Sequence, residues 1–417
     1  MGNNNIFCFF VICFSYIIGG VFYVIHGFNF VDEILVLIIL SYYIIYAFIQ
    51  RKVDKNIKTI SLFLLFYLLY SLAIGVTNKM AVFRDLLQES KPLISFFVIY
   101  ALNPSFNQIM KQTLMIMSLV FGGLSFILFV IGGDLFFGHN AFYGHIMLMS
   151  SLIYLFASTR NKMDLLVFFF LLSLGLLCTR SKYYGEFALA LILMFVVKMP
   201  IKIGFKSLLG GLSTICIVIL AAWEKFNAYF VEGLDNDSIA RNLLYIKSLD
   251  VLKDFFPFGS GFGTYGVDAT KVYYSPLYYK YGLSNIWGLS ENYDSFIADT
   301  YFPVIIAQFG LLGIFLFYKF LKLIVNKAGE GYLPHDNILY ASVILIISSI
   351  LIESVAGPMF VMSSGSTILI LLACCLREME IKKMKVLNSR MLYLILLWRG
   401  GVRNSNVKVV KKQKIVQ

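Results

Sequence analysis

Apolar residues along this chain come in runs of about twenty, and short polar clusters separate the runs. A helix of that length crosses the hydrocarbon core of a bilayer, which is roughly 30 Å thick. The pattern predicts about twelve membrane-spanning helices, at residues 6–25, 34–50, 59–76, 81–102, 113–132, 141–158, 163–178, 185–199, 204–222, 301–320, 338–356 and 358–376. The expected fold class is all-α, as in a polytopic integral membrane protein.

The composition supports this class. Hydrophobic residues make up 59% of the chain and charged residues 14%, whereas a soluble domain carries about 25% charged residues. The six cysteines fall in or beside apolar runs without metal-ligand spacing, so we expect small apolar side chains rather than a metal site. The opening MGNNN has no positive charge, and no cleavable signal peptide is expected.

The fourth apolar run is the least regular. Its first half, AVFRDLLQESK, carries Arg84, Asp85, Glu89 and Lys91. Charged side chains within a membrane-spanning helix face protein or a water-filled cavity rather than lipid. We therefore expect this half of the helix to face the interior of the bundle.

Lysine and arginine in short connections favour the cytoplasmic side. RKVDKNIK (51–58), TRNK (159–162), KMPIKIGFK (198–206) and the region of Lys319, Lys322 and Lys327 all fall on one side. The tail 377–417 has eleven Lys and Arg against two Glu, a net +9 of the formal +12. This excess predicts a cytoplasmic tail near anionic lipid rather than a nucleic-acid surface, with 391–398 on the inner leaflet. Both termini are expected in the cytoplasm.

The predicted domain order is spans one to nine in residues 1–222, a loop at 223–298, three spans at 299–376 and the tail. The loop is long, polar and aromatic, lies outside the cytoplasm, and is of a length that is usually functional. Four basic residues also fall on that unfavoured side: Arg84, Lys91, Arg180 and Lys182. They suggest a bound anion, although ordinary charges at a membrane interface explain each of them equally well.

Within the loop, residues 238–256 have apolar positions at helical spacing: Ile239, Leu243, Ile246, Leu249 (or Leu252) and Phe256. This predicts a helix that Pro257 ends. Arg241, Tyr245 and Ser248 share one face, and the Arg fork suits phosphate while the Tyr ring suits a sugar. The alternative is an amphipathic helix lying on the membrane with Arg241 solvated.

The next stretch, FGSGFGTYG (258–266), contains a literal G-x-G-x-x-G. A dinucleotide site would need a strand before these glycines and a helix after them. Here a predicted helix precedes them, and KVYYSPLYYKYG (271–282) follows. We expect instead a tight turn whose glycines permit unusual backbone angles or close approach of a ligand.

Three elements together resemble the O-antigen polymerase and ligase superfamily. The first runs from Arg241 through Phe256-Pro257 to Gly259, Gly261 and Gly263, in a long external loop. The second is DTYFPVIIAQFGLLG (299–313), similar to the family's entry into the next span, and the third is LLCTRSKYYGEFALAL (176–191), like its Ser-Arg element. The three follow the family order, and the family layout covers the whole chain.

Two departures favour the Wzy-type polymerases within that superfamily. Ligases typically begin the second of these elements with a catalytic His, whereas Asp299 stands there and residues 223–298 contain no His. Lys182 stands where Arg is usual, with Arg180 two residues earlier.

The resemblance implies an enzyme of the bacterial inner membrane that needs no cofactor or metal. It would move a growing glycan from undecaprenyl pyrophosphate to the next lipid-linked repeat unit, with a chain-length regulator and a flippase as partners. A ligase that transfers polymer to lipid A–core and a flippase for lipid-linked repeats are the alternatives.

The site residues expected from this chemistry fall into three groups. Arg241 and Arg180 hold the pyrophosphate, because fixed cations stabilise the charge that develops on it. Asp299, then Asp294 and Glu291, are candidates for the base, or simply caps for the next helix. The expected substrate contacts are Lys182, Tyr245, Gly259, Gly261, Gly263, Arg84 and Lys91.

Three further polar residues are ambiguous. Glu353 lies near the end of its apolar run, where either a function or a pairing with a basic residue is expected. His139 and His145 lie near the outer end of the sixth run. They are interpreted as polar interface residues rather than catalysts.

Overall fold

The computed structural model of the protein describes residues 2–22, 31–195, 200 and 238–398. Over this part of the chain every regular element is a helix, as the sequence predicts. The main helices are α1 (Gly2–Phe14), η1 (Ser15–Phe22), α3 (Val31–Gln50), α4 (Lys55–Ile74), α5 (Lys79–Leu102), α6 (Gln108–Phe137), α7 (Asn140–Ala157), α8 (Lys162–Leu174), α9 (Ser181–Phe195), α12 (Ser238–Asp254), α13 (Asp268–Val272), α14 (Pro276–Lys280), α15 (Phe302–Gly331), α16 (Asn337–Ser354) and α17 (Ser363–Trp398).

Six segments of the described chain are long and apolar enough to cross a membrane: Asp32–Gln50, Lys55–Ile74, Gln108–Gly133, Asn140–Ala157, Phe302–Gly331 and Pro334–Ser354. They differ in burial. The α4 segment is 17% buried and the α7 segment 83%, as expected of a lipid-facing and a central helix. These helices indicate a membrane protein, while twelve spans and their sidedness stay predictions. The predicted run 204–222 lies outside the described residues.

Two helices extend beyond the predicted runs. α15 continues to Gly331 instead of ending at residue 320, since good helix formers such as Leu and Lys follow and Pro334 comes only later. α17 is one helix from Ser363 to Trp398. The segment 391–398, expected as a separate surface element, therefore continues α17, because no proline or glycine interrupts the helix after Gly365.

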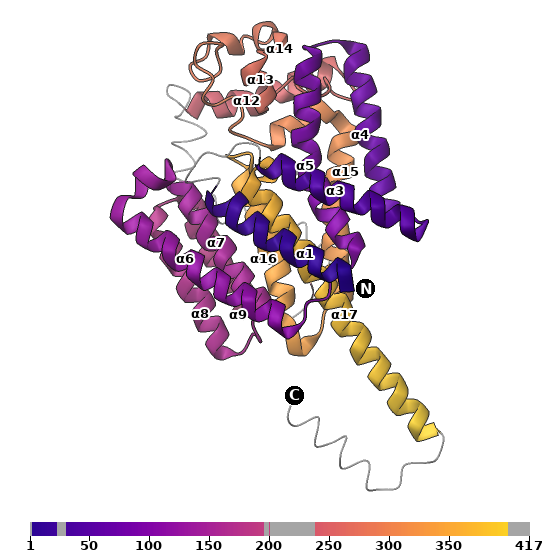
Figure 1. The fold of residues 1–417 in the computed structure, drawn as a ribbon. Helices are drawn as coiled ribbons and strands as arrows, with labels where there is room; N and C mark the ends of the chain where they lie inside the picture. Colours follow the sequence, from indigo (N-terminus) through magenta and orange to yellow (C-terminus); the bar gives the residue numbers. More distant parts are fainter. Residues whose placement is uncertain (1, 23–30, 196–199, 201–237, 399–417) are drawn as a thin grey trace.

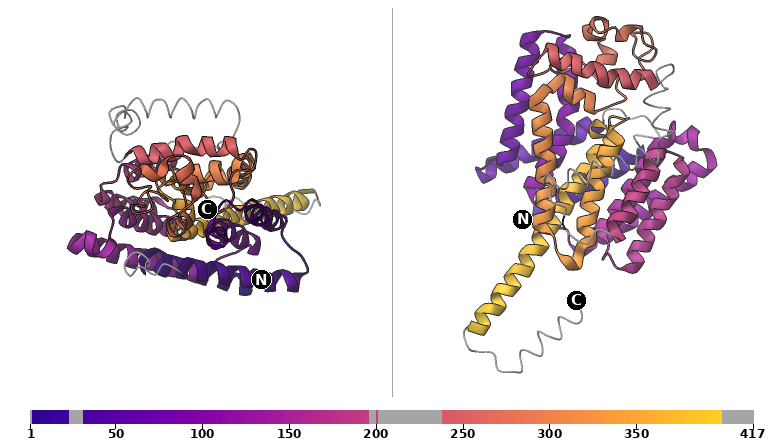
Figure 2. Two further views of the ribbon diagram at one scale, coloured as in Figure 1. Left: turned by 90° about the horizontal axis from the view of Figure 1, so that it is seen from above. Right: turned by 180° about the vertical axis from the view of Figure 1, so that it is seen from behind.

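The helices form two groups around a central pair (Figure 1). α6, α7, α8 and α9 lie on one side, while α4, α5 and α15 lie on the other, and the view from behind agrees (Figure 2). α16 and α17 pass between the groups, with α16 packed on α9 and α17 on α5. The short helices α12, α13 and α14 cover one end of the bundle, and α17 projects from the other.

The charged half of α5 faces the interior, as predicted. Asp85, Glu89 and Lys91 are buried. Lys91 Nζ lies 2.6 Å from Asp32 Oδ2, so the start of α3 compensates its charge. Arg84 is the exception, because its side chain is exposed.

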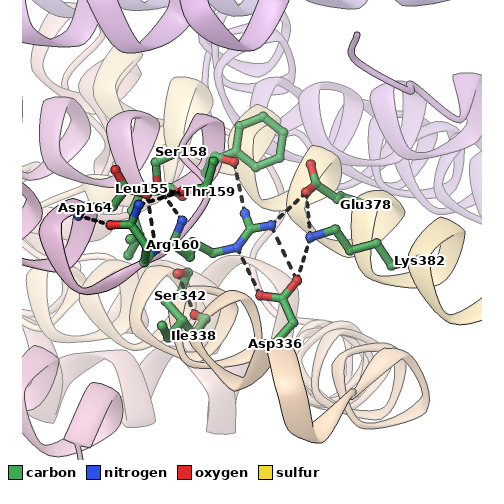
Figure 3. Close-up of polar contacts among 12 residues, drawn as sticks. Leu155, Ser158, Thr159, Arg160, Asp164, Asp336, Ile338, Ser342, Glu378 and Lys382 are labelled. Atoms are coloured by element: carbon green, nitrogen blue, oxygen red, sulfur yellow. Dashed lines mark hydrogen bonds and ion pairs between the residues drawn. The ribbon is translucent and has the colours of Figure 1, made fainter. Parts of the chain in front are cut away.

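A cluster of ion pairs ties together α6, α17 and the segments just after α7 and just before α16. Figure 3 shows four of its residues: Arg160, Asp336, Glu378 and Lys382. Arg160 Nε lies 3.0 Å from Asp336 Oδ1, and Arg160 Nη2 lies 3.1 Å from Glu378 Oε1. Lys382 Nζ is 2.6 Å from Asp336 Oδ2, and Lys111 Nζ is 2.5 Å from Glu378 Oε2. We call these five residues the Arg160 cluster. The sequence identified Arg160 only as a marker of orientation, since none of its partners is near in sequence.

Candidate active site

The C-terminal end of α16 (residues 353–356) joins three elements that are distant in sequence. α16 has 18 residues, so at about 1.5 Å per residue this end lies roughly 27 Å from the Arg160 cluster at its start. Each element donates hydrogen bonds to it: Lys182 Nζ to Glu353 Oε2 (2.5 Å) and Ala356 O (2.9 Å), Tyr245 OH to Val355 O (2.8 Å), and Tyr301 N to Ser354 O (3.2 Å). Three segments that lie far apart in the sequence therefore meet at one end of the bundle.

The face predicted on α12 exists. Arg241 and Tyr245 lie one turn apart, and burial raises the pKa of Tyr245 to about 12, so its hydroxyl keeps the proton it donates. Ser248 is fully buried, and its hydroxyl donates a hydrogen bond to Tyr245 O at 2.6 Å. This hydroxyl therefore has a structural role and does not face the outside of the protein.

Arg241 contacts Asp299, the predicted base. Its Nε and Nη2 both approach Asp299 Oδ2, and its guanidinium carbon lies 5.7 Å from the centroid of the Phe296 ring. The two charged side chains are 37% and 25% exposed. The pair can therefore be reached from outside the protein, and its charges are mutually compensated in this state.

Arg180 contacts the ring of His139, a residue that the sequence placed at the interface. His139 caps α7, where its Nδ1 accepts from Ala141 N at 3.2 Å. Burial lowers the pKa of His139, Arg180 lowers it further, and the nearby Asp299 opposes them. These effects favour the neutral form of His139, which lies within electrostatic reach of both Arg180 and Asp299. This is the residue that sequence reasoning missed, because its one signal was a position before an apolar run.

Glu353 is paired with Lys182, one of the two expectations for this carboxylate. Its Oε2 also lies 3.5 Å from His145 Nε2, too long for a firm hydrogen bond. Glu353 and His145 are both buried. Lys182 therefore has a built-in counter-charge on α16.

Four predicted residues have other partners. Arg84 Nη2 lies 2.6 Å from Asp268 Oδ2, and Lys91 is buried against Asp32. Glu291 accepts from Tyr279 OH at 2.6 Å, and the backbone oxygen of Asp294 accepts from Ile297 N at 3.1 Å. In the described part of the chain none of the four contacts Arg241, Arg180 or Lys182. Their sequence positions were compatible with the site, but the packing of α5 and of the loop gives them other neighbours.

The glycine turn is a packing element. Gly259, Gly261 and Gly263 have φ of 79°, 85° and 71°, the unusual backbone angles that were predicted. Their N–H groups donate to Phe255 O (2.8 Å), Gln308 O (2.9 Å) and Asp85 Oδ2 (2.6 Å). A Cβ at the three positions would lie 2.6 Å from Ala307 O, 2.6 Å from Ser71 Oγ and 2.7 Å from Ala81 O. The atoms that closely approach these glycines thus belong to the protein itself. The three amides already have acceptors, so they are not free for the ligand whose close approach was one expectation from the sequence.

The apolar stripe used to predict α12 faces outward. Ile246, Leu249 and Phe256 are exposed, whereas Ala240, Leu244 and Val251 are buried against α15 and the loop. The helix is correctly predicted, but it has two apolar faces. The exposed face suits the membrane interface, as in the amphipathic alternative.

The site therefore combines cations with two proton acceptors at one partly open end of the bundle. Arg241, Arg180 and Lys182 supply positive charge, while Asp299 and the neutral His139 can accept a proton. No family profile and no curated protein matches this sequence. What the site does is therefore argued from its own geometry.

Proposed function

We propose that the protein is a glycan polymerase of the inner membrane that uses a polyprenyl-pyrophosphate-linked donor. The observation that supports this is the meeting of Lys182, Tyr245 and Tyr301 at residues 353–356. The meeting brings together the three sequence elements on which the family resemblance rests. Membrane-spanning helices beside the site suit a substrate that carries a lipid.

The cations suit the leaving group. A pyrophosphate gains negative charge as its bond to the sugar breaks, and fixed guanidinium groups stabilise that charge in the transition state. The Arg241 guanidinium can form two parallel hydrogen bonds with phosphate oxygens through Nε and Nη2, the two nitrogens that now both approach Asp299 Oδ2. A bound pyrophosphate would compete with Asp299 for Arg241 and release the carboxylate for proton transfer.

The proposed step follows from that exchange. The acceptor hydroxyl oxygen bonds to the anomeric carbon of the growing glycan, and the bond from that carbon to the pyrophosphate oxygen breaks. The electron pair leaves with the pyrophosphate, which Arg241 and Arg180 hold, and the hydroxyl proton passes to Asp299. His139 is the second candidate acceptor for this proton.

One observation favours the ligase as a second candidate. The argument against a ligase was the missing His in residues 223–298, yet His139 lies against Arg180 and near Asp299. A histidine from another element therefore stands close to the site. Both candidates use the same donor and differ in the acceptor.

A deletion strain tests the proposal through the ladder of its surface polysaccharide on a gel. The strain is complemented with the wild type, Arg241→Ala, Arg241→Lys or Arg84→Ala. Arg84 is the control, because its partner Asp268 lies outside the site. The polymerase predicts that deletion and Arg241→Ala leave only lipid core with a single repeat, Arg241→Lys rescues little, and Arg84→Ala restores the ladder.

The other outcomes are distinct. Polymer that persists on the lipid carrier without reaching the core would identify a ligase. Lipid-linked single repeats that accumulate inside the cell would identify a flippase. An Arg241→Ala strain with a normal ladder and normal protein level would exclude the proposed site.

A further inference from the structure

A groove with a volume of about 560 Å³ runs between α4, α5 and α15, the helices on one side of Figure 1. This volume lies within the roughly 300–1,000 Å³ of pockets that hold small molecules. Its walls are largely aromatic and aliphatic, with Phe63, Phe97, Phe309 and Phe317 among them. α4 is the least buried of the six candidate spans, so the groove borders the lipid side of the bundle.

The two ends of the groove differ in their polar side chains, since its three lysines, with Glu330, lie at one end only. Glu89 and Tyr301 line the end near the candidate active site, and Tyr301 OH donates to Glu89 Oε2 at 3.0 Å. Lys319, Lys322 and Lys327 line the other end. Lys319 follows Tyr301 by 18 residues, and because α15 is kinked at Gly310 the two lie at most about 27 Å apart at about 1.5 Å per residue, within the thickness of a hydrocarbon core.

Of the three lysines at this end, two are available to an anion. Lys319 and Lys322 are exposed and lie over the rings of Phe315 and Tyr318. No carboxylate of the described chain lies within ion-pair distance of either Nζ, whereas Lys327 pairs with Glu330 at 3.0 Å. Two uncompensated cations thus stand at the mouth of an apolar groove.

We propose that this groove binds an anionic phospholipid, with its phosphate at Lys319 and Lys322 and an acyl chain along α15. Basic pockets between membrane helices bind anionic headgroups in this way. The opposite end, where Glu89 and Tyr301 line the groove, offers no lysine or arginine of the described chain to an anion and so disfavours the reverse orientation. It also disfavours the donor lipid of the proposed reaction, whose pyrophosphate would lie beside Glu89 instead of the lysines.

Native mass spectrometry of the full-length protein in detergent tests this inference. The probes are dioleoyl phosphatidylglycerol and dioleoyl phosphatidylcholine, which have identical chains and different headgroup charge. The variants are Lys319→Gln/Lys322→Gln, and Leu316→Trp, which fills the groove wall. The matched control Lys162→Gln/Lys253→Gln removes two exposed lysines elsewhere.

The wild type is expected to retain one phosphatidylglycerol in preference to phosphatidylcholine. The Lys319→Gln/Lys322→Gln variant should weaken phosphatidylglycerol binding about tenfold or more, since the attraction of two lysines to an anionic headgroup together exceeds one tenfold step in affinity. The control should bind like the wild type. Leu316→Trp should lose both lipids, which distinguishes a filled groove from a lost charge.

Three results would overturn the inference. Equal binding of the two lipids would show that charge does not select the occupant. An equal loss in the control would show non-specific attraction to the surface. Undecaprenyl phosphate that displaces phosphatidylglycerol and binds independently of Lys319 and Lys322 would assign the groove to the donor lipid. Because the readout is lipid binding, it is independent of whether the protein is a polymerase.

Discussion

Gly259→Ala gives the sharpest test of the packing in the glycine turn. Gly259 has a φ of +79°, and a Cβ there would lie 2.6 Å from Ala307 O and 2.6 Å from the carbonyl carbon of Gln308. A left-handed backbone costs a non-glycine residue about 1–2 kcal/mol. Overpacking adds about 1–3 kcal/mol when neighbours must move. We expect a loss of roughly 2–5 kcal/mol in the free energy of unfolding.

Gly282→Ala is the matched control. Gly282 has a φ of +71°, but no atom lies within 4 Å of the position that a Cβ would take there. Only the backbone cost applies, so the expected loss is about 1–2 kcal/mol. Thermal unfolding of both purified proteins in one detergent, followed by near-UV circular dichroism, gives the order directly. Gly259→Ala should unfold at a clearly lower temperature than Gly282→Ala.

Two results would refute the reasoning. If both variants lost the same stability, steric contact with α15 would contribute nothing. If Gly259→Ala kept its stability but abolished polymer formation, the turn would be a ligand-binding element, one of the two roles that the sequence allowed. The second result would restore Gly259, Gly261 and Gly263 to the substrate site.

Three other contacts give predictions of their own. His139→Gln distinguishes the two proton acceptors: with His139 as the acceptor, its lowered pKa places the acid limb of polymerisation in vitro below pH ~6.5 and the variant loses activity, whereas with Asp299 as the acceptor the variant keeps most of its activity. Glu353→Gln should cost about 3 kcal/mol in thermal unfolding by stranding Lys182, and Lys182→Met should restore part of it. Arg160→Gln should cost about 3 kcal/mol, because the partly buried Asp336 and Glu378 lose Arg160 and keep only Lys382 and Lys111, whereas Lys327→Gln, at an exposed pair, should cost less than ~1 kcal/mol.

Local features of the fold could be predicted from the sequence. Apolar runs identified the long apolar helices, because the helix period and the membrane thickness act on each run separately. The stretch after the glycine turn was not expected to open a helix, yet α13 and α14 lie there. The buried half of α5 followed from the cost of exposing Asp85, Glu89 and Lys91 to lipid. The positive φ of the glycines followed from a turn that ends a helix. None of these inferences needed a distant partner.

The partners themselves could not be predicted. Arg241 and Asp299 are 58 residues apart, and Arg180 lies 41 residues after His139. Periodicity shows which residues share a face of a helix but not what that face meets. α12 illustrates the limit, because its predicted apolar stripe is exposed and a second apolar face is buried. The site residues Arg241 and Asp299 were both candidates from the sequence, whereas their contact is a product of tertiary structure.

Exposure separates the ion pair that can bind a substrate from those that hold the fold. Arg160 and Asp336 are 5% and 13% exposed, and Lys91 and Asp32 are 6% and 5% exposed. An incoming anion could replace such a carboxylate only by entering a desolvated space, and it would leave the old partner buried and unpaired. Arg241 and Asp299, at 37% and 25%, can exchange partners with water at hand. Exposure alone does not select Arg241, since Arg84 and Asp268 are 45% and 42% exposed. In the proposed reaction the pyrophosphate is assigned to Arg241 because Arg241 also lies on α12 beside residues 353–356, and the buried pairs fix the helices that position it.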